Sequence, residues 1–111
     1  MADYNDYLPD VKRYDADADE AAVKGIVKHL GIALQSKNAD SALVSGSDKT
    51  ELDRVRESWC KKKLARTETD TELDTAIADI VTTMRADNHK QRVTFYYLLA
   101  KKFGVLESLR A

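Results

Sequence analysis

The stretch from Asn88 to Gly104, which reads NHKQRVTFYYLLAKKFG, constrains the fold of this 111-residue chain more than any other. When it is placed on a helix at about 100° per residue, its apolar side chains cover an arc of roughly 200°. A helix that packs on a surface needs an apolar stripe of only about 100°. The width of the arc therefore predicts that this helix is enclosed on several sides and is the central post of a small helical domain.

Capping signatures predict where the surrounding helices begin. In each signature an Asp or Thr can accept hydrogen bonds from the free N–H groups of the first turn, and a Glu follows three residues later. The signatures are Asp17-x-x-Glu20, Asp48-x-x-Glu51 and Thr69-x-x-Glu72, and apolar residues recur at helical spacing after each. Asn88 is the expected cap of the last helix. Gly31 and Gly104 stand where a left-handed residue ends a helix.

These signals predict an all-α fold, a compact bundle in which residues 1–111 form one helical domain. One proline and four glycines leave few breaks, and no segment has the pattern of a strand. Pro9 suits the opening turn of a short first helix. The four main helices are expected at about 17–30, 48–64, 70–86 and 88–103, with short helices near 4–14 and 40–45.

Charge is segregated along the chain beneath a net value of −1. Residues 1–48 and 67–87 carry net charges of −4 and −5, whereas residues 49–66 and 88–111 carry +4 each. Neighbouring helices can neutralise one another through exposed pairs, each contributing about 0–1 kcal/mol. Alternatively, the helices at 48–64 and 88–103 can share one basic face that binds nucleic acid or another anion.

The candidate interaction surface therefore combines basic residues of these two helices with two tyrosines whose hydroxyl groups need partners if they are buried. Its members are Arg54, Arg56, Lys61, Lys62, Lys63, Arg92, Tyr96, Tyr97, Lys101 and Lys102.

No metal site is predicted. Asp15-x-Asp17-x-Asp19 resembles the start of a calcium-binding EF-hand loop, but Glu20 and Ile26 occupy the places that require Gly and Glu. The histidines, at positions 29 and 89, and the single cysteine, at position 60, lack the short spacing of zinc ligands.

Nor is a catalytic site predicted. Cys60 follows a tryptophan on a half-apolar helix and is expected to be a packing residue. The sequence contains no phosphate-binding glycine loop and no nucleophile elbow. We therefore expect a protein that is not an enzyme and needs no cofactor.

The expected location is the cytoplasm. A single cysteine fits a reducing compartment. No apolar run approaches the roughly 18 residues that span a membrane, and the N-terminus lacks the pattern of a secretory signal.

Four segments, DVKRYD, IVKHLGIAL, RVRESWCKKKL and RVTFYYLLAKKFG, occur in this order. In order and spacing they resemble a small bacterial family known only as a domain of unknown function, the 2853 family. The resemblance extends over nearly the whole chain and is most specific in the last segment. It implies a small, cytoplasmic, helical bacterial protein, and it implies no activity and no binding residues.

Two functional hypotheses follow. The first is a non-enzymatic module that binds another protein or itself, because charge is segregated and no catalytic constellation is visible. The second is binding of nucleic acid or another anion through the basic face.

Overall fold

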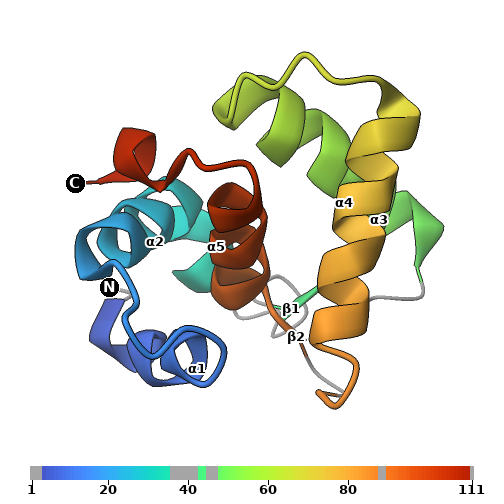
Figure 1. Ribbon diagram of the computed structural model, residues 1–111. Helices are drawn as coiled ribbons and strands as arrows, with labels where there is room; N and C mark the ends of the chain where they lie inside the picture. Colours follow the sequence, from blue (N-terminus) through green and yellow to red (C-terminus); the bar gives the residue numbers. More distant parts are fainter. Residues whose placement is uncertain (1–3, 36–42, 45–47, 88–89, 111) are drawn as a thin grey trace.

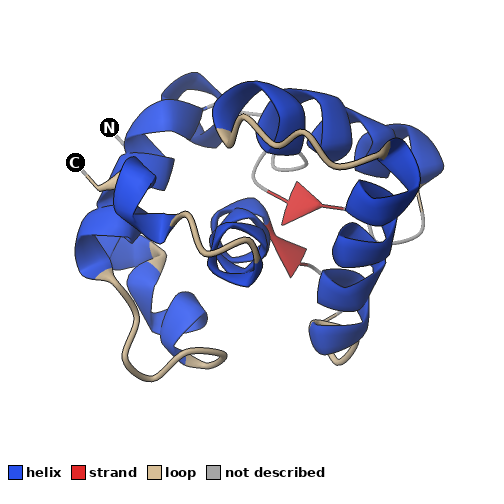
Figure 2. Ribbon diagram, turned by 45° about the horizontal axis from the view of Figure 1, so that its top comes forward, coloured by secondary structure: helices blue, strands red, loops and turns tan. Residues whose placement is uncertain are grey.

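Helix α5 (Arg92–Lys102) runs through the middle of the molecule, and the other helices pack around it (Figures 1 and 2). The computed structural model describes residues 4–35, 43–44, 48–87 and 90–110, with side chains described for all of these except 31–35 and 43. All eight residues from Val93 to Ala100 are buried. The predicted central post and the predicted all-α fold are both confirmed.

The two ends of the described chain lie on the same side of the bundle (Figure 1). There α2 contacts both the first helical turn, η1, and the last one, η4. The helical elements are η1 (Tyr4–Asp6), α1 (Leu8–Lys12), α2 (Glu20–Gln35), α3 (Lys49–Arg54), η3 (Val55–Lys63), α4 (Asp70–Thr83), α5 and η4 (Leu106–Leu109). Pro9 lies in the first turn of α1, as predicted.

Two of the predicted caps are confirmed. Asp48 accepts hydrogen bonds from the N–H groups of Thr50 and Glu51 at the start of α3. Thr69 and Glu72 form a complete, reciprocal capping box at the start of α4. Both pairs use only residues within one helical turn, which is why the sequence identifies them.

The predicted bounds of the second helix, 17–30, are wrong at both ends. The side chain of Asp19, not that of Asp17, accepts the hydrogen bond from the N–H of Ala22 and caps α2. Asp19 is also held from a distance, because its main-chain N–H donates to the hydroxyl group of Tyr97. The helix continues through Gly31 to Gln35, since a glycine costs only about 1 kcal/mol inside a helix.

The third predicted helix, 48–64, changes its winding halfway. After α3 the chain continues as a π-helix, η3, in which N–H groups bond five residues back, as Leu64 does to Trp59. At about 100° per residue, Leu64 would point roughly 180° away from Val55. At about 4.4 residues per turn the two lie within roughly 20°. The wider winding therefore lets Val55, Trp59 and Leu64 all be buried.

The prediction of a helix at 40–45 is wrong for the residues that can be compared. Leu43–Val44 form strand β1, which pairs antiparallel with strand β2 (Lys90–Gln91). The remaining residues of that segment, 40–42 and 45, lie outside the described part of the chain, as does the expected cap Asn88. Two residues are too few to show the alternation of apolar and polar side chains that predicts a strand. The two strands are also more than 40 positions apart in the sequence.

The start of the last helix also differs from expectation. Residues 90–91 are extended, so α5 begins at Arg92 with Gln91 as its N-cap. Thr94, a polar residue of this helix, is fully buried and donates its hydroxyl hydrogen to Asp10. Gly104 ends the helix as predicted, with a φ of 72° that L side chains rarely adopt.

Candidate interaction surface

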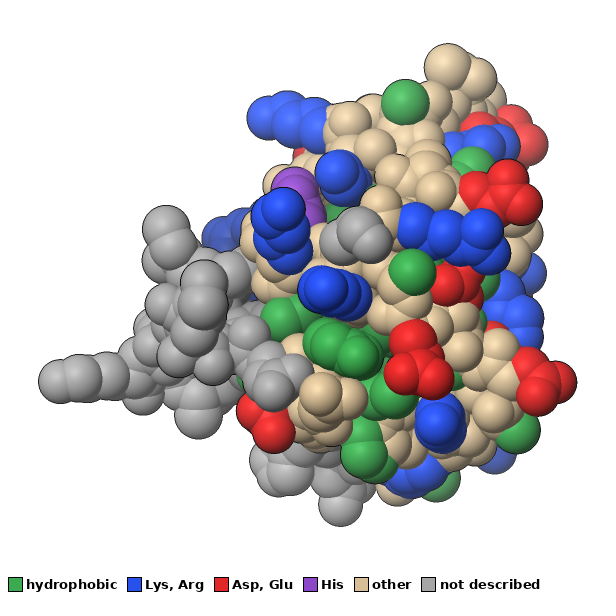
Figure 3. All heavy atoms as spheres, turned by 90° about the vertical axis from the view of Figure 1, so that its left-hand side faces the viewer, with side chains coloured by type: hydrophobic (Ala, Val, Ile, Leu, Met, Phe, Trp, Pro, Cys, Tyr) green, Lys and Arg blue, Asp and Glu red, His purple; other side chains and the backbone are tan. Residues whose placement is uncertain are grey.

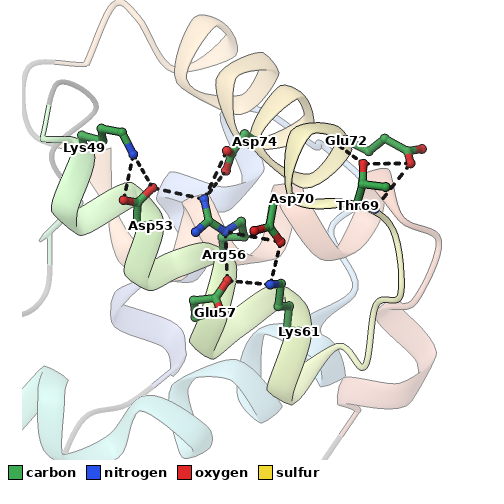
Figure 4. Close-up of polar contacts among 9 residues, drawn as sticks. All are labelled: Lys49, Asp53, Arg56, Glu57, Lys61, Thr69, Asp70, Glu72 and Asp74. Atoms are coloured by element: carbon green, nitrogen blue, oxygen red, sulfur yellow. Dashed lines mark hydrogen bonds and ion pairs between the residues drawn. The ribbon is translucent and has the colours of Figure 1, made fainter.

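The structure distributes the ten predicted surface residues over different environments. Arg56 and Lys61 lie in a network of carboxylates between η3 and α4 (Figure 4). The Arg56 guanidinium is 3.0 Å from a carboxylate oxygen of Asp74, and the Lys61 ammonium is 2.6 Å from one of Asp70. Glu57 contacts both cations at 2.9 Å. Their charges are thus neutralised within the molecule.

Most of the other predicted cations are paired as well. The ammonium groups of Lys101 and Lys102 lie 3.3 Å from Asp15 and 3.1 Å from Asp79. Arg54 is exposed, with a guanidinium nitrogen 3.8 Å from Glu51. On the helices expected to share a basic face, Arg56, Lys61, Lys101 and Lys102 therefore lie beside acids of other elements.

Arg92 and Tyr96 are components of the core. The Arg92 side chain is only 13% exposed, and it bonds both to Glu51 and, at 3.1 Å, to the hydroxyl group of Tyr96. The Tyr96 ring stacks on Trp59 with centroids 4.4 Å apart. Burial raises the pKa of Tyr96 above its ordinary value, although the Arg92 charge opposes this. Neither side chain is placed to contact a partner.

Tyr97 is fully buried, and its hydroxyl group organises the turn before α2. The hydroxyl donates to Asp15 at 2.7 Å and accepts from the main-chain N–H of Asp19 at 2.9 Å. Burial and then the hydrogen bond to Asp15 raise the pKa of Tyr97 to about 12. Two of the three acids that resembled a calcium loop therefore have other roles: Asp15 accepts from Tyr97, and Asp19 caps α2.

Lys62 and Lys63 differ from these residues, because they are exposed and make no ion pair with any residue in the described part of the chain. The same holds for Lys24 and Lys28, which lie one helical turn apart on α2. In Figure 3, Lys and Arg side chains gather around the one histidine in view. We define the lysine surface as Lys24, Lys28, Lys62 and Lys63 together with His29.

His29 connects the two elements that carry the lysines. Its ring lies 5.5 Å from the ring of Trp59, centroid to centroid, so α2 and η3 meet at this pair of side chains. Partial burial of the imidazole, and then the positive charge of Lys63, lower the pKa of His29 below its ordinary value. Both effects favour the neutral imidazole.

Sequence reasoning found Lys62 and Lys63 but missed Lys24 and Lys28. Residues 1–48 are acidic overall, and that average concealed two lysines spaced by four on one helix face. This spacing could have been recognised in the sequence. Like charges at i and i+4 destabilise an isolated helix by about 0.2–0.5 kcal/mol, so such a pair is a feature that needs an explanation. Their proximity to η3 was not readable, since it depends on the contact between His29 and Trp59.

The remaining chemistry of the described residues is limited. Cys60 is fully buried, and burial raises the pKa of its thiol to about 12, so the nucleophilic thiolate is scarce at neutral pH. No three His, Cys, Asp or Glu side chains converge as a metal site among the residues described. In the same residues, no helix is long and apolar enough to cross a membrane.

Comparison with known protein families gives one match. The model of a family described as "Protein of unknown function (DUF2853)" matches residues 6–107. The chain belongs to this family. A comparison with curated proteins found no match.

The DUF2853 match confirms the resemblance seen in the sequence and extends over nearly the whole chain. It includes both helices that carry the lysine surface, α2 and η3, and the central helix α5. The family description assigns no activity.

Proposed function

We propose that the protein is a non-enzymatic interaction module that contacts another protein through the lysine surface. The observation that supports this is the contrast between two groups of cations. Arg56, Lys61 and Lys102 have acidic partners within the molecule, whereas Lys28 and Lys63 are exposed without one among the described residues. A group of unpaired charges from two elements is available to an outside partner.

The lone, buried cysteine is consistent with a reducing compartment, so we place this contact in the cytoplasm. Self-association is one form of the proposal, in which the partner is a second copy of the chain.

Binding of nucleic acid or another anion is the second candidate. The basic face first expected on the helices at 48–64 and 88–103 is interrupted by acidic partners such as Asp70 and Asp79. The lysine surface replaces it as the place where phosphate groups would bind. Such binding would be steeply salt-dependent.

Site-specific photo-crosslinking tests the proposal. A photoreactive amino acid replaces Lys28 in one variant and Thr75, exposed on α4 at the other side of α5, in a control. In an extract of the producing cells treated with nuclease, we expect a discrete protein adduct at position 28 only. The adduct should weaken when Lys24 and Lys63 are changed to Glu.

Two results would contradict the proposal. One is the absence of any protein adduct that depends on Lys24 and Lys63. The other is an adduct that disappears with nuclease, which would favour nucleic acid. Sedimentation of the purified protein at several concentrations distinguishes a second copy from a different partner.

A further inference from the structure

The charges of the lysine surface have a definite spacing. Lys24 and Lys28 are one turn apart on α2, which corresponds to a rise of about 6 Å. Lys63 approaches from η3, close enough to His29 for its charge to affect that ring. The surface thus presents two ammonium groups in a row on α2 and a third on η3, the element that meets α2 at the contact between His29 and Trp59.

We infer that this surface recognises an acidic segment of a partner protein, one with carboxylates about 6 Å apart. This inference rests on the proposed function and specifies the partner's chemistry. Glu or Asp residues at i and i+4 of a helix rise by about 6 Å, which matches the row formed by Lys24 and Lys28. A third carboxylate next to the row would meet Lys63.

Charge complementarity supports this partner. The two lysines on α2 are like charges at i and i+4, an arrangement that disfavours an isolated helix. Carboxylates of a docked partner would offset that repulsion. Lys61, one position before Lys62, lies within reach of a helix that carries carboxylates, and its ammonium group is 2.6 Å from Asp70 of α4. An acidic helix docked over α2 and η3 would repeat that arrangement.

The same surface is poorly suited to nucleic acid. It contains no arginine, whose planar guanidinium group binds phosphate and guanine in a bidentate manner. The indole ring of Trp59, which contacts His29, is buried and stacked on Tyr96, so it offers no face on which a base could stack.

Fluorescence anisotropy with a defined peptide tests the inference. The probe is a fluorescein-labelled peptide of about three helical turns with Glu at every fourth position. A second peptide has Gln in place of each Glu, and a single-stranded DNA of similar length is the third probe. The full-length protein is titrated into each probe at about 50 mM salt.

The decisive variant is Lys28→Glu/Lys63→Glu. Its matched control is Lys12→Glu/Arg85→Glu, which changes the net charge equally through exposed residues outside the lysine surface. We expect the acidic peptide to bind the parent protein, and the Lys28/Lys63 variant to bind it at least about tenfold more weakly. The control should change the affinity by less than about twofold beyond the effect of net charge. Circular dichroism verifies that both variants fold.

Several outcomes would overturn the inference. Failure of the acidic peptide to bind, equal binding of the Gln peptide, or equal weakening by both variants would each do so. Tighter binding of the DNA would assign the surface to nucleic acid instead. If position 28 still crosslinks to a protein while the acidic peptide does not bind, only the inferred chemistry is wrong. If both experiments fail, the proposed function fails as well.

Discussion

The indole nitrogen of Trp59 donates a 3.2 Å hydrogen bond to the main-chain carbonyl oxygen of Tyr96, and the two rings stack. This contact ties the π-helix η3 to the central helix α5. On its other side, the Trp59 ring approaches His29 of the lysine surface. One side chain therefore connects the core of the fold with the surface proposed to bind a partner.

Trp59→Phe should destabilise the protein by about 1–3 kcal/mol, because it removes this hydrogen bond and leaves unfilled space in the core. Urea unfolding followed by far-ultraviolet circular dichroism measures the change without relying on tryptophan fluorescence. Tyr4→Phe, at a half-buried position, is the control and should change stability by less than about 0.5 kcal/mol. Equal effects of the two substitutions would contradict the role given to Trp59.

Leu99→Ala should cost about 2–5 kcal/mol, since Leu99 is fully buried in the enclosed helix α5. Thermal unfolding provides the measurement. Thr75→Ala, on the exposed face of α4, should have an effect within about 0.5 kcal/mol. A thermal midpoint unchanged by Leu99→Ala would mean that α5 is not the hub of the fold.

Asp87→Asn should make stability less dependent on acid pH. Hydrogen bonds from Arg13 and then Tyr14 hold the pKa of the Asp87 carboxyl below its ordinary value of 3.8. The folded protein therefore binds this proton less readily than the unfolded chain does. The stabilisation is present above pH 3.8 and is lost as the pH falls through the folded-state pKa.

Unfolding by urea from about pH 7 down to about pH 2 tests this prediction. Asp87→Asn should be less stable than the parent protein at neutral pH, and the difference should shrink below pH 3.8. Asp17→Asn, at an exposed position, should follow the parent throughout. A constant difference between the parent and Asp87→Asn at every pH would argue against the Arg13 and Tyr14 contacts.

Cys60 should be unreactive in the folded protein. Its thiol is fully buried and its pKa is raised to about 12, first by burial and then by the negative charge of Glu68. A colorimetric thiol reagent at about pH 8 should label Cys60 only as fast as the protein opens. Labelling should become rapid in urea. Rapid labelling without denaturant would contradict the burial of Cys60 and would reopen a nucleophilic role for it.

Local signals in the sequence predicted several features correctly. Thr69 and Glu72 cap α4, Asp48 caps α3, and Gly104 ends α5. Each of these depends on residues within about one helical turn, so neighbours along the chain decide the outcome. The choice of Asp19 over Asp17 at the start of α2 could not be predicted in this way, because Tyr97 and Arg110 hold Asp19 from elsewhere in the chain.

The winding of η3 marks a second limit. The residues from Val55 to Lys63 have an ordinary helical composition, and nothing local distinguishes a bond to the fifth residue from one to the fourth. Packing makes the difference, since only the wider turn buries Leu64 on the same side as Val55 and Trp59.

By itself, the sequence determined that α5 would be the enclosed helix and that the fold would be helical, because the width of an apolar arc is a property of consecutive residues. Only the tertiary structure decided which charges are neutralised. Lys61 and Lys62 are neighbours in the chain, yet one bonds to Asp70 while the other is exposed without an ion pair among the described residues. A charge acquires its partner from elements that meet across the molecule, as η3 and α4 do at Lys61 and Asp70.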